Sequence, residues 1–286
     1  MGIQTFYQFI RSREFNIVQH KNTGETLRGA RVGVDISIYL FKWCARPIVH
    51  AGRRIDHLLG LYFMTVDLLA RGAVPLYVFD SRQVADSEGA YKRARAPSSV
   101  RWAPNTVAEC CQMLDAFGLP YVRDSGHESD IVLAHMSRAG VIDWVISPDS
   151  DMLARGARAV IINYRTGAAE VDTIVLQDAL RELGLDYPRF VEVLCVARTD
   201  YSDGLRGTSI MSAWRAVRRR PVISFMEHPE VQRAWTEFMR SVDIGPIAPS
   251  RRPEVAALQA AVANYGAALG LQKNKIDGAQ RRLLNF

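Results

Sequence analysis

Short apolar runs alternate with amphipathic stretches through the first half of the chain. The runs with the length and composition of buried strands are residues 30–36, 74–79, 119–122, 144–147 and 159–163. The stretches with a helical repeat are residues 38–44, 55–70, 107–117 and 130–139. Because strands that alternate with helices form parallel sheets through crossover connections, this pattern predicts an α/β fold with a mostly parallel central sheet flanked by helices.

Seven carboxylates lie at or just beyond the ends of apolar runs. They are Asp35, Asp80, Glu128, Asp130, Asp149, Asp151 and Asp200. In open α/β sheets, functional groups collect at the C-terminal ends of the strands. We therefore expect Asp35, Asp80 and Asp149 to meet at one edge of the sheet. A helix that begins near Glu128 and Asp130 should bring two more acids to the same edge.

The remainder of the chain is basic. Lys and Arg total 36 against 30 Asp and Glu, and the formal net charge is +6. With the seven acids set aside, 36 basic residues face 23 acidic ones, which suggests a polyanionic partner. Closely packed carboxylates repel one another, and divalent ions with oxygen ligands, such as Mg²⁺, can relieve that repulsion. This combination is typical of metal-dependent nucleases, in which two ions about 4 Å apart activate water and stabilise the leaving oxygen.

A long basic segment, residues 81–104, separates Asp80 from the next predicted helix. It carries Arg82, Lys92, Arg93, Arg95 and Arg101, with Tyr91 and Trp102 interleaved. The segment is longer than the usual crossover loop, and long loops beside a site tend to be functional. A solvated insertion is the alternative interpretation.

The second half of the chain is helical. Helices are predicted over residues 177–183, 188–196, 214–219, 231–240 and 254–269, and a Pro-, Gly- and Ser-rich linker over 244–253. Asp203 is expected to cap the helix that follows it. We expect one domain over residues 1–270, with an α/β core over 1–176 and a helical part over 177–270. A flexible tail is predicted over 271–286.

The four cysteines, Cys44, Cys110, Cys111 and Cys195, show no metal-ligand spacing. They indicate reduced thiols in an intracellular protein. The sequence shows no signal peptide or transmembrane stretch, so no membrane association is expected.

Several motifs, taken in order, resemble the flap endonuclease/XPG family of structure-specific 5′ nucleases. The chain begins MGIQTFYQFI and continues with GVDIS, VFDS, HESD, SPDSD and TDYSDGLRG. The most specific features are the acid-x-acid pair Glu128/Asp130 and the Asp-x-Asp pair Asp149/Asp151. The resemblance implies a PIN-like 5′ nuclease fold, with a helix–two-turn–helix near residues 196–219 that clamps duplex DNA.

The resemblance also implies a role for each acid. All seven would be metal ligands and catalytic residues around two Mg²⁺ ions, for which Mn²⁺ can substitute. Glu128, Asp130, Asp149 and Asp151 are expected closest to the ions. Asp35 and Asp80 complete one side, partly through water, and Asp200 reaches in from the helical part.

Contacts to DNA are implied at further positions. Arg93, preceded by Lys92, matches a catalytic arginine that holds the scissile phosphate, whereas Asp86 stands where the family has a partner lysine. Gly2 resembles a glycine that approaches DNA closely. Phe41 matches an aromatic that stacks on a terminal base, with core packing as its alternative. The short arch formed by residues 81–104 suits bubbles, junctions or blunt and gapped ends.

Two further sites are expected from the resemblance. Gly207 belongs to a hairpin that binds backbone phosphate, often with K⁺, although Gly207-Thr208-Ser209 replaces the family's Gly-x-Gly. Gln280, Leu283 and Phe286 match a motif that docks on a sliding clamp.

The leading interpretation is a metal-dependent DNA 5′ nuclease that cleaves flaps, junctions or 5′ ends in replication, repair or recombination. Its partner would be branched or flapped DNA, and it would be a monomer off DNA, at intracellular sites of replication. The alternatives are an RNA endonuclease similar to the herpesviral host-shutoff nucleases, a dimeric Holliday-junction resolvase, and a non-catalytic clamp-associated DNA-binding scaffold.

Overall fold

The computed structural model describes residues 4–12, 15–81, 103–199, 201–219, 225, 227–240, 244 and 253–285. Of the predicted basic arch, this includes only Ser81, Ala103 and Pro104, and of the predicted linker only Ile244 and Pro253.

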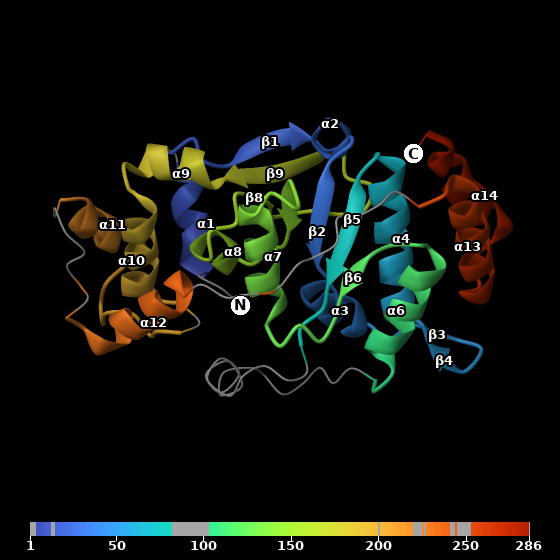
Figure 1. Cartoon of the computed structure of the whole chain (residues 1–286), viewed down its shortest axis with the longest axis horizontal. Coiled ribbons are helices and arrows are strands. Elements are labelled where there is room, and N and C mark those ends of the chain that lie inside the picture. Colours follow the sequence, from blue (N-terminus) through green and yellow to red (C-terminus); the bar gives the residue numbers. More distant parts are fainter. Residues whose placement is uncertain are drawn as a thin grey trace.

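A seven-stranded sheet forms the centre of the molecule, with strand order β1-β9-β8-β7-β2-β5-β6 (Figure 1). Five strands run parallel: β2 (Arg31–Asp35), β5 (Val74–Val78), β6 (Tyr121–Val122), β7 (Trp144–Ile146) and β8 (Ala159–Ile161). Two strands that the sequence did not predict, β1 (Gln19–Asn22) and β9 (Glu170–Val175), extend the sheet through antiparallel pairs. The predicted α/β fold is therefore confirmed, with an antiparallel edge added.

Helices cover both faces of the sheet. They are α1 (Gln4–Ile10), α2 (Thr23–Leu27), α3 (Ile36–Cys44), α4 (Asp56–Ala70), α6 (Thr106–Ala116), α7 (Ser129–Arg138) and α8 (Asp151–Ala154). A small hairpin of β3 (Val49–His50) and β4 (Arg53–Arg54) joins α3 to α4. α4 ends where Gly72 adopts a φ of +80°, a left-handed conformation that favours glycine after a helix.

The sheet divides the buried apolar side chains into two clusters. On β5, Leu76 and Val78 join one cluster and Tyr77 the other, as the two-residue repeat of a strand requires. Gly33 lets β2 approach the first cluster closely. A Cβ at this position would lie 2.5 Å from side-chain carbons of Leu133 and Ile142. Tight packing on both faces fixes the end of β2, where Asp35 lies.

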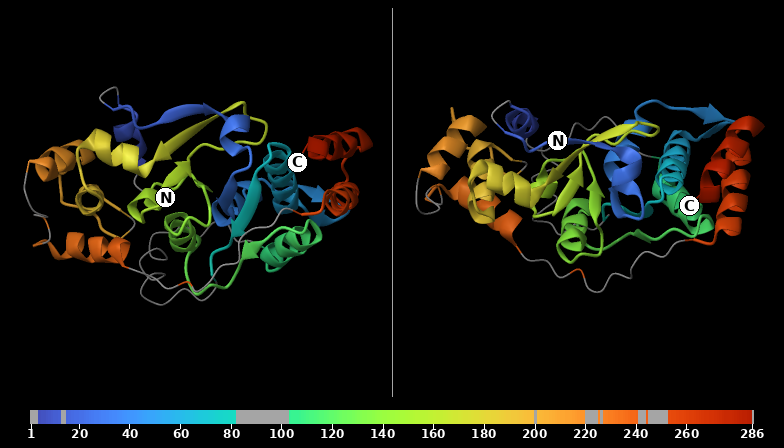
Figure 2. Two further views of the ribbon diagram at one scale, coloured as in Figure 1. Left: turned by 45° about the horizontal axis from the view of Figure 1, so that its top comes forward. Right: turned by 90° about the horizontal axis from the view of Figure 1, so that it is seen from above.

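The later helices divide between the two ends of the molecule (Figure 1). At one end are α9 (Leu176–Leu183), α10 (Tyr187–Ala197), α11 (Ile210–Arg218) and α12 (Pro229–Met239). At the other end are α13 (Val255–Ala268), α14 (Lys273–Arg282) and the short helix η1 (Leu283–Asn285), which lie beside α4 (Figure 2). The sequence predicted a single helical part over residues 177–270. The structure differs from that prediction, because α13 packs on α4 rather than on α10 or α12.

The C-terminal residues also differ from the predicted flexible tail. Leu283 is fully buried, and Gln280 exchanges side-chain-to-backbone hydrogen bonds with Gln259 of α13, at 3.0 and 3.3 Å. Tyr62 of α4 donates a hydrogen bond to the backbone oxygen of Val262 (3.1 Å). These contacts hold α14 and η1 on the body of the protein. In the part of the chain that the structure describes, no helix is long and apolar enough to span a bilayer.

Candidate active site

Asp35, the last residue of β2, lies at the centre of a group of carboxylates. Its residue exposure is only 4%. The Ser129 hydroxyl donates to Asp35 Oδ1 (2.9 Å), and the Ser147 hydroxyl donates to Asp35 Oδ2 (3.0 Å). Burial, followed by the nearby charge of Asp80, raises the pKa of Asp35 to about 8, although the bond from Ser129 opposes the shift. Asp35 therefore lies where negative charge is in excess.

Ser129 also ties in the acid that follows β5. The Ser129 backbone N–H donates to Asp80 Oδ1 (2.9 Å), while the Asp80 N–H donates to the Ser37 hydroxyl at the start of α3 (2.9 Å). Since Ser129 lies between Glu128 and Asp130, one residue joins the ends of β2 and β5 to the beginning of α7. The exposed Asp80 thereby lies beside the buried Asp35.

Asp149 and Asp151 follow β7 in a compact turn. The Asp149 N–H donates to the Ser147 hydroxyl (3.1 Å), and the Asp151 N–H donates to Asp149 Oδ1 (3.1 Å). Their exposures are 8% and 0%. Because Ser147 also binds Asp35, the turn is connected directly to the carboxylates of the neighbouring strands.

A buried guanidinium lies against Asp130. Arg155 Nε donates to Asp130 Oδ2 (3.0 Å), and Arg155 Nη2 donates to the Tyr201 hydroxyl. Tyr201 in turn lies 3.5 Å from Glu128 Oε2. Burial alone would lower the pKa of Arg155, but the neighbouring Asp130, Tyr201 and Asp151 raise it above its ordinary value. The sequence analysis did not identify Arg155, since only the fold places it against an acid from another helix.

Six of the seven predicted acids are thus described, and hydrogen bonds or electrostatic interactions connect them. Asp200 lies outside the described residues, as do Gly2, Lys92, Arg93 and Phe286. Within the described ranges, no group of three or more His, Cys, Asp or Glu side chains is arranged to hold a metal ion by itself.

The chemistry of this donor set nevertheless fits a divalent cation. The side chains offer oxygen atoms, the ligand type that Mg²⁺ prefers. Burial, and then the charge of Asp80, raises the pKa of Asp35, and a bound cation would favour its ionised form. The Tyr7 hydroxyl is buried and has no hydrogen-bond partner among the described residues. Burial and then the charges of Asp149 and Asp151 raise the pKa of Tyr7 well above its ordinary value. Tyr7, which the sequence analysis missed, is therefore placed to donate to a water or phosphate oxygen near these acids.

Comparisons with known proteins decide the family. Residues 1–99 match the XPG N-terminal domain, and residues 118–200 match the XPG I-region. The chain belongs to the flap endonuclease/XPG family. It is 28% identical over 245 residues to flap endonuclease 1 of Methanosphaerula palustris, covering 70% of this chain and 73% of that protein. It is 24% identical over 259 residues to flap endonuclease 1 of Sulfolobus acidocaldarius, covering 74% of each.

Solved structures of related nucleases share the fold. The catalytic core of Rad2 in complex with DNA substrate superposes with a TM-score of 0.74 at 19% identity, covering 99% of this chain and 100% of that chain. Flap endonuclease-1 from Methanococcus jannaschii gives 0.72 at 18% identity, covering 96% and 98%. Human GEN1 in complex with Holliday junction DNA gives 0.71 at 17% identity, covering 99% and 77%. The family assignment makes this flap endonuclease/XPG member a 5′ nuclease, a phosphodiester hydrolase of a metal-dependent family.

Two cavities of this nuclease flank α3 beside the carboxylates. The first, about 350 Å³, is lined by Phe41, Asp80, Ser81, Ala103, Pro104, Val107, Arg123 and Asp124. Phe41 is 38% exposed, so the structure places it at a cavity beside Asp80 rather than in the core. The second cavity, about 410 Å³, includes Tyr39, Lys42, Trp43, Pro148 and Arg165 in its lining. Burial lowers the pKa of Lys42. The negative charge of Asp35 opposes this decrease, and the positive charge of Arg165 lowers the pKa further. Lys42 and Arg165 had no distinguishing signal in the sequence.

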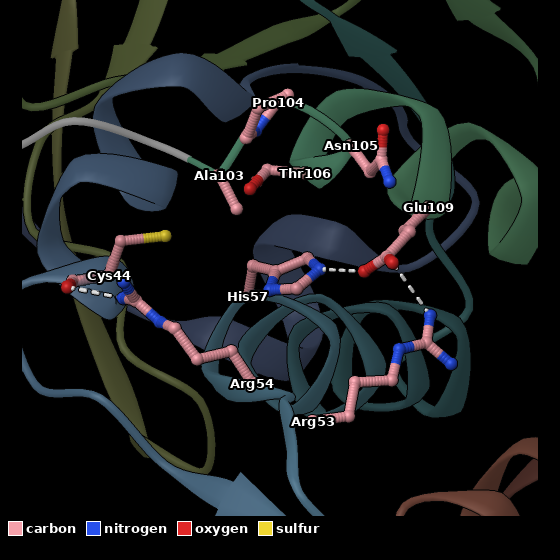
Figure 3. A pocket seen from close by; sticks show the side chains of 9 residues that line it. All are labelled: Cys44, Arg53, Arg54, His57, Ala103, Pro104, Asn105, Thr106 and Glu109. Atoms are coloured by element: carbon pink, nitrogen blue, oxygen red, sulfur yellow. Dashed lines mark hydrogen bonds and ion pairs between the residues drawn. The ribbon is translucent and has the colours of Figure 1, made fainter.

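A smaller cavity of about 150 Å³ lies at the beginning of α6, where the chain returns from residues 82–102 (Figure 3). Glu109 of α6 lies 2.7 Å from His57 Nε2 of α4 and 2.8 Å from Arg53 Nη2 of the β3–β4 hairpin. Arg54 donates to the backbone oxygen of Cys44 (2.8 Å). These bonds join α3, α4 and α6 at one side of the first cavity.

The predicted helix–two-turn–helix corresponds to α10, a turn and α11. Gly204 packs so closely that a Cβ would lie 2.5 Å from the Ala197 backbone oxygen, whereas a Cβ at Gly207 would meet nothing within 4 Å. Gly207 has a φ of +77°, so it forms an open left-handed turn. The predicted cap is wrong, because the Ser209 hydroxyl rather than Asp203 caps α11, accepting from the Ser212 N–H (3.2 Å).

Proposed function

We propose that this protein is a structure-specific, metal-dependent DNA nuclease that cleaves phosphodiester bonds at 5′ flaps, junctions or 5′ ends. It would act within the cell during DNA replication, repair or recombination. The observation that carries the proposal is the connection of Asp35, Asp80 and Asp149 through Ser129 and Ser147 at one edge of a parallel sheet. With the seven acids set aside, basic residues outnumber acidic ones by 36 to 23, which favours a polyanionic substrate such as DNA.

The proposed ligands of two Mg²⁺ ions are the six described acids together with Asp200. Ions bound there would activate the attacking water and stabilise the leaving oxygen. Ser129 and Ser147 hold the Asp35 carboxylate in one orientation. The Tyr7 hydroxyl supplies a hydrogen-bond donor beside Asp149 and Asp151. Lys92 and Arg93 are proposed to hold the scissile phosphate, and Gly2 to lie near it.

The two cavities that flank α3 suggest how a DNA strand crosses the acids. On one side, Phe41 offers an aromatic face on which a base can stack. On the other side, Lys42 and Arg165 supply positive charge for backbone phosphates. Duplex DNA is proposed to contact the turn at Gly207, where exposed backbone can approach a phosphate, with K⁺ as a further ligand.

A clamp contact through Gln280, Leu283 and Phe286 is also proposed. Because Leu283 is buried and Gln280 is bonded to Gln259, this contact requires η1 to leave the surface of α4 and α13. Clamp binding would then compete with folding of the C-terminus.

The test of the proposed function is cleavage of labelled 5′-flap, nicked-junction, blunt duplex and single-stranded RNA substrates with Mg²⁺. The flap or junction should be cut, and Asp149→Asn should abolish cutting. Asp143→Asn is the matched control. Asp143 pairs with Arg31 where β2 and β7 begin, whereas the acids of the site lie where these strands end. Cutting that survives Asp149→Asn would show that the site is elsewhere. Cutting of RNA alone would favour the RNA endonuclease, and cutting of the junction alone by a dimer would favour the resolvase.

A further inference from the structure

Arg155 is a cation enclosed within the acidic site. It caps the C-terminal end of α8, four residues after Asp151, and is only 4% exposed. Its side chain and that of Asp130 are 5% and 6% exposed, and Arg155 Nε lies 3.0 Å from Asp130 Oδ2. The pair is therefore shielded from water on both sides.

Two aromatic rings complete the surroundings of the guanidinium. Its central carbon lies 5.3 Å from the ring centroid of Tyr201 and 5.4 Å from that of Phe238. Tyr201 also accepts a hydrogen bond from Arg155, and Phe238 belongs to α12. Arginine keeps its charge in proteins. The fold thus places a permanent positive charge against Asp130, within electrostatic reach of Asp151 and Glu128.

A fixed cation changes what Asp130 can do. A carboxylate that binds a divalent ion must offer an oxygen atom at a place where the electrostatic potential is negative. Here one oxygen of Asp130 already accepts from Arg155, and a metal ion drawing close would be repelled by the guanidinium. A buried carboxylate that loses its partner is strongly destabilised, so the pair will not separate readily.

We propose that Arg155 is a built-in counter-ion that pairs with the proposed ligand Asp130 in the DNA-free enzyme and competes with divalent metal for it. The inference rests on the proposed function only in taking Asp130 and the surrounding acids as the metal site. Its consequence is that the DNA-free enzyme binds divalent ions more weakly than its acids alone would allow. Arg155 also joins α8 to Tyr201 and α12, so removal of the charge should affect both metal binding and the attachment of the helical end.

The competition can be measured without cleavage. Mn²⁺ binding to the full, DNA-free chain is followed by electron paramagnetic resonance for wild type and variants. Arg155→Met should tighten binding by about tenfold, the scale on which groups next to metal ligands act. Arg155→Lys keeps the charge and should bind as wild type does. Asp130→Asn leaves the guanidinium unbalanced and should weaken binding, while the double variant should return close to wild type.

A second Arg–Asp pair, with side chains 18% and 7% exposed, provides the matched control. Arg71 Nε lies 2.9 Å from Asp67 Oδ2 at the C-terminal end of α4, and Tyr164 donates to the same oxygen (2.6 Å). Arg71→Met should lower the melting temperature without changing Mn²⁺ affinity. By contrast, Mn²⁺ should raise the melting temperature of Arg155→Met far more than that of wild type, because metal can then occupy the place of the lost cation.

The sign of the change decides the matter. Weaker Mn²⁺ binding by Arg155→Met would show that Arg155 supports a metal-binding Asp130, and unchanged binding would show that the pair lies outside the metal site; either result overturns the inference. If Arg155→Met folds only with Mn²⁺, the inference is supported, and the charge-balanced double variant then supplies the metal-free comparison. A wild-type protein that binds Mn²⁺ but cuts none of the substrates would contradict the proposed function alone.

Discussion

The Ser129 hydroxyl donates a 2.9 Å hydrogen bond to Asp35 although the two residues are 94 positions apart. Ser129 lies between two acids of the site, and its backbone N–H binds a third, Asp80. A serine that the chemistry itself does not require therefore sets the relative positions of two strands and a helix.

Replacement of Ser129 by alanine should lower the cleavage rate by about tenfold, because residues that orient metal ligands have effects of this size. Stability should fall by about 1–2 kcal/mol, since buried Asp35 loses a donor. The matched control is Ser137→Ala on the same helix. Ser137 is equally buried, but its hydroxyl accepts from the Arg158 N–H (2.9 Å), away from the site. Single-turnover rates and urea unfolding separate the effects. Equal losses of rate in the two variants would refute the role of Ser129.

The metal-free protein should become less stable as pH rises. The pKa of Asp35 is raised to about 8 in the folded state, compared with about 4 for an unfolded aspartate. Between these values the folded state binds the extra proton, so the free energy of unfolding falls as pH increases. Thermal unfolding in a chelator from pH 5 to 8 measures the slope. Asp35→Asn should flatten it, and saturating Mg²⁺ should reduce it by favouring the ionised carboxylate. Stability that rises with pH in the metal-free protein would contradict a buried Asp35 with a raised pKa.

Phe41→Ala tests the cavity beside Asp80. Phe41 is 38% exposed, so its removal should scarcely alter stability. If a base stacks on the ring, affinity for DNA should fall by about 1–3 kcal/mol. Phe63 has the same exposure of 38% but lies on α4 and does not line this cavity, which makes Phe63→Ala the matched control. Fluorescence anisotropy with a labelled flap in Ca²⁺ would measure the DNA affinity of each variant. Identical affinities of Phe41→Ala and Phe63→Ala would exclude stacking on Phe41.

The sequence predicted the parallel strands and most helices well because their apolar repeats are strong and local. It missed β1 and β9, since Gln19–Asn22 is polar and alternates between half-buried and exposed, and it pairs with residues about 150 positions away. The acids were predicted because each follows a strand. Arg155 was not, because its position against Asp130 depends on how α7 and α8 meet. No local pattern distinguishes a buried guanidinium from a surface one.

The C-terminus gives the clearest contrast between pattern and packing. α14 is so polar that only Ala279 is buried within it, and the sequence therefore suggested a flexible tail. Leu283, which follows it, is fully buried, whereas the adjacent Leu284 is 66% exposed. Leu283→Ala should lower the free energy of unfolding by about 2–5 kcal/mol, as buried leucines do, or free the C-terminal helices to detach from α4. Leu284→Ala should change it little. Urea unfolding and hydrogen exchange over residues 273–285 would measure the difference. A tail that exchanges at the rate of unfolded peptide in the wild-type protein would show that α14 does not stay docked, and would leave Leu283 available to a clamp.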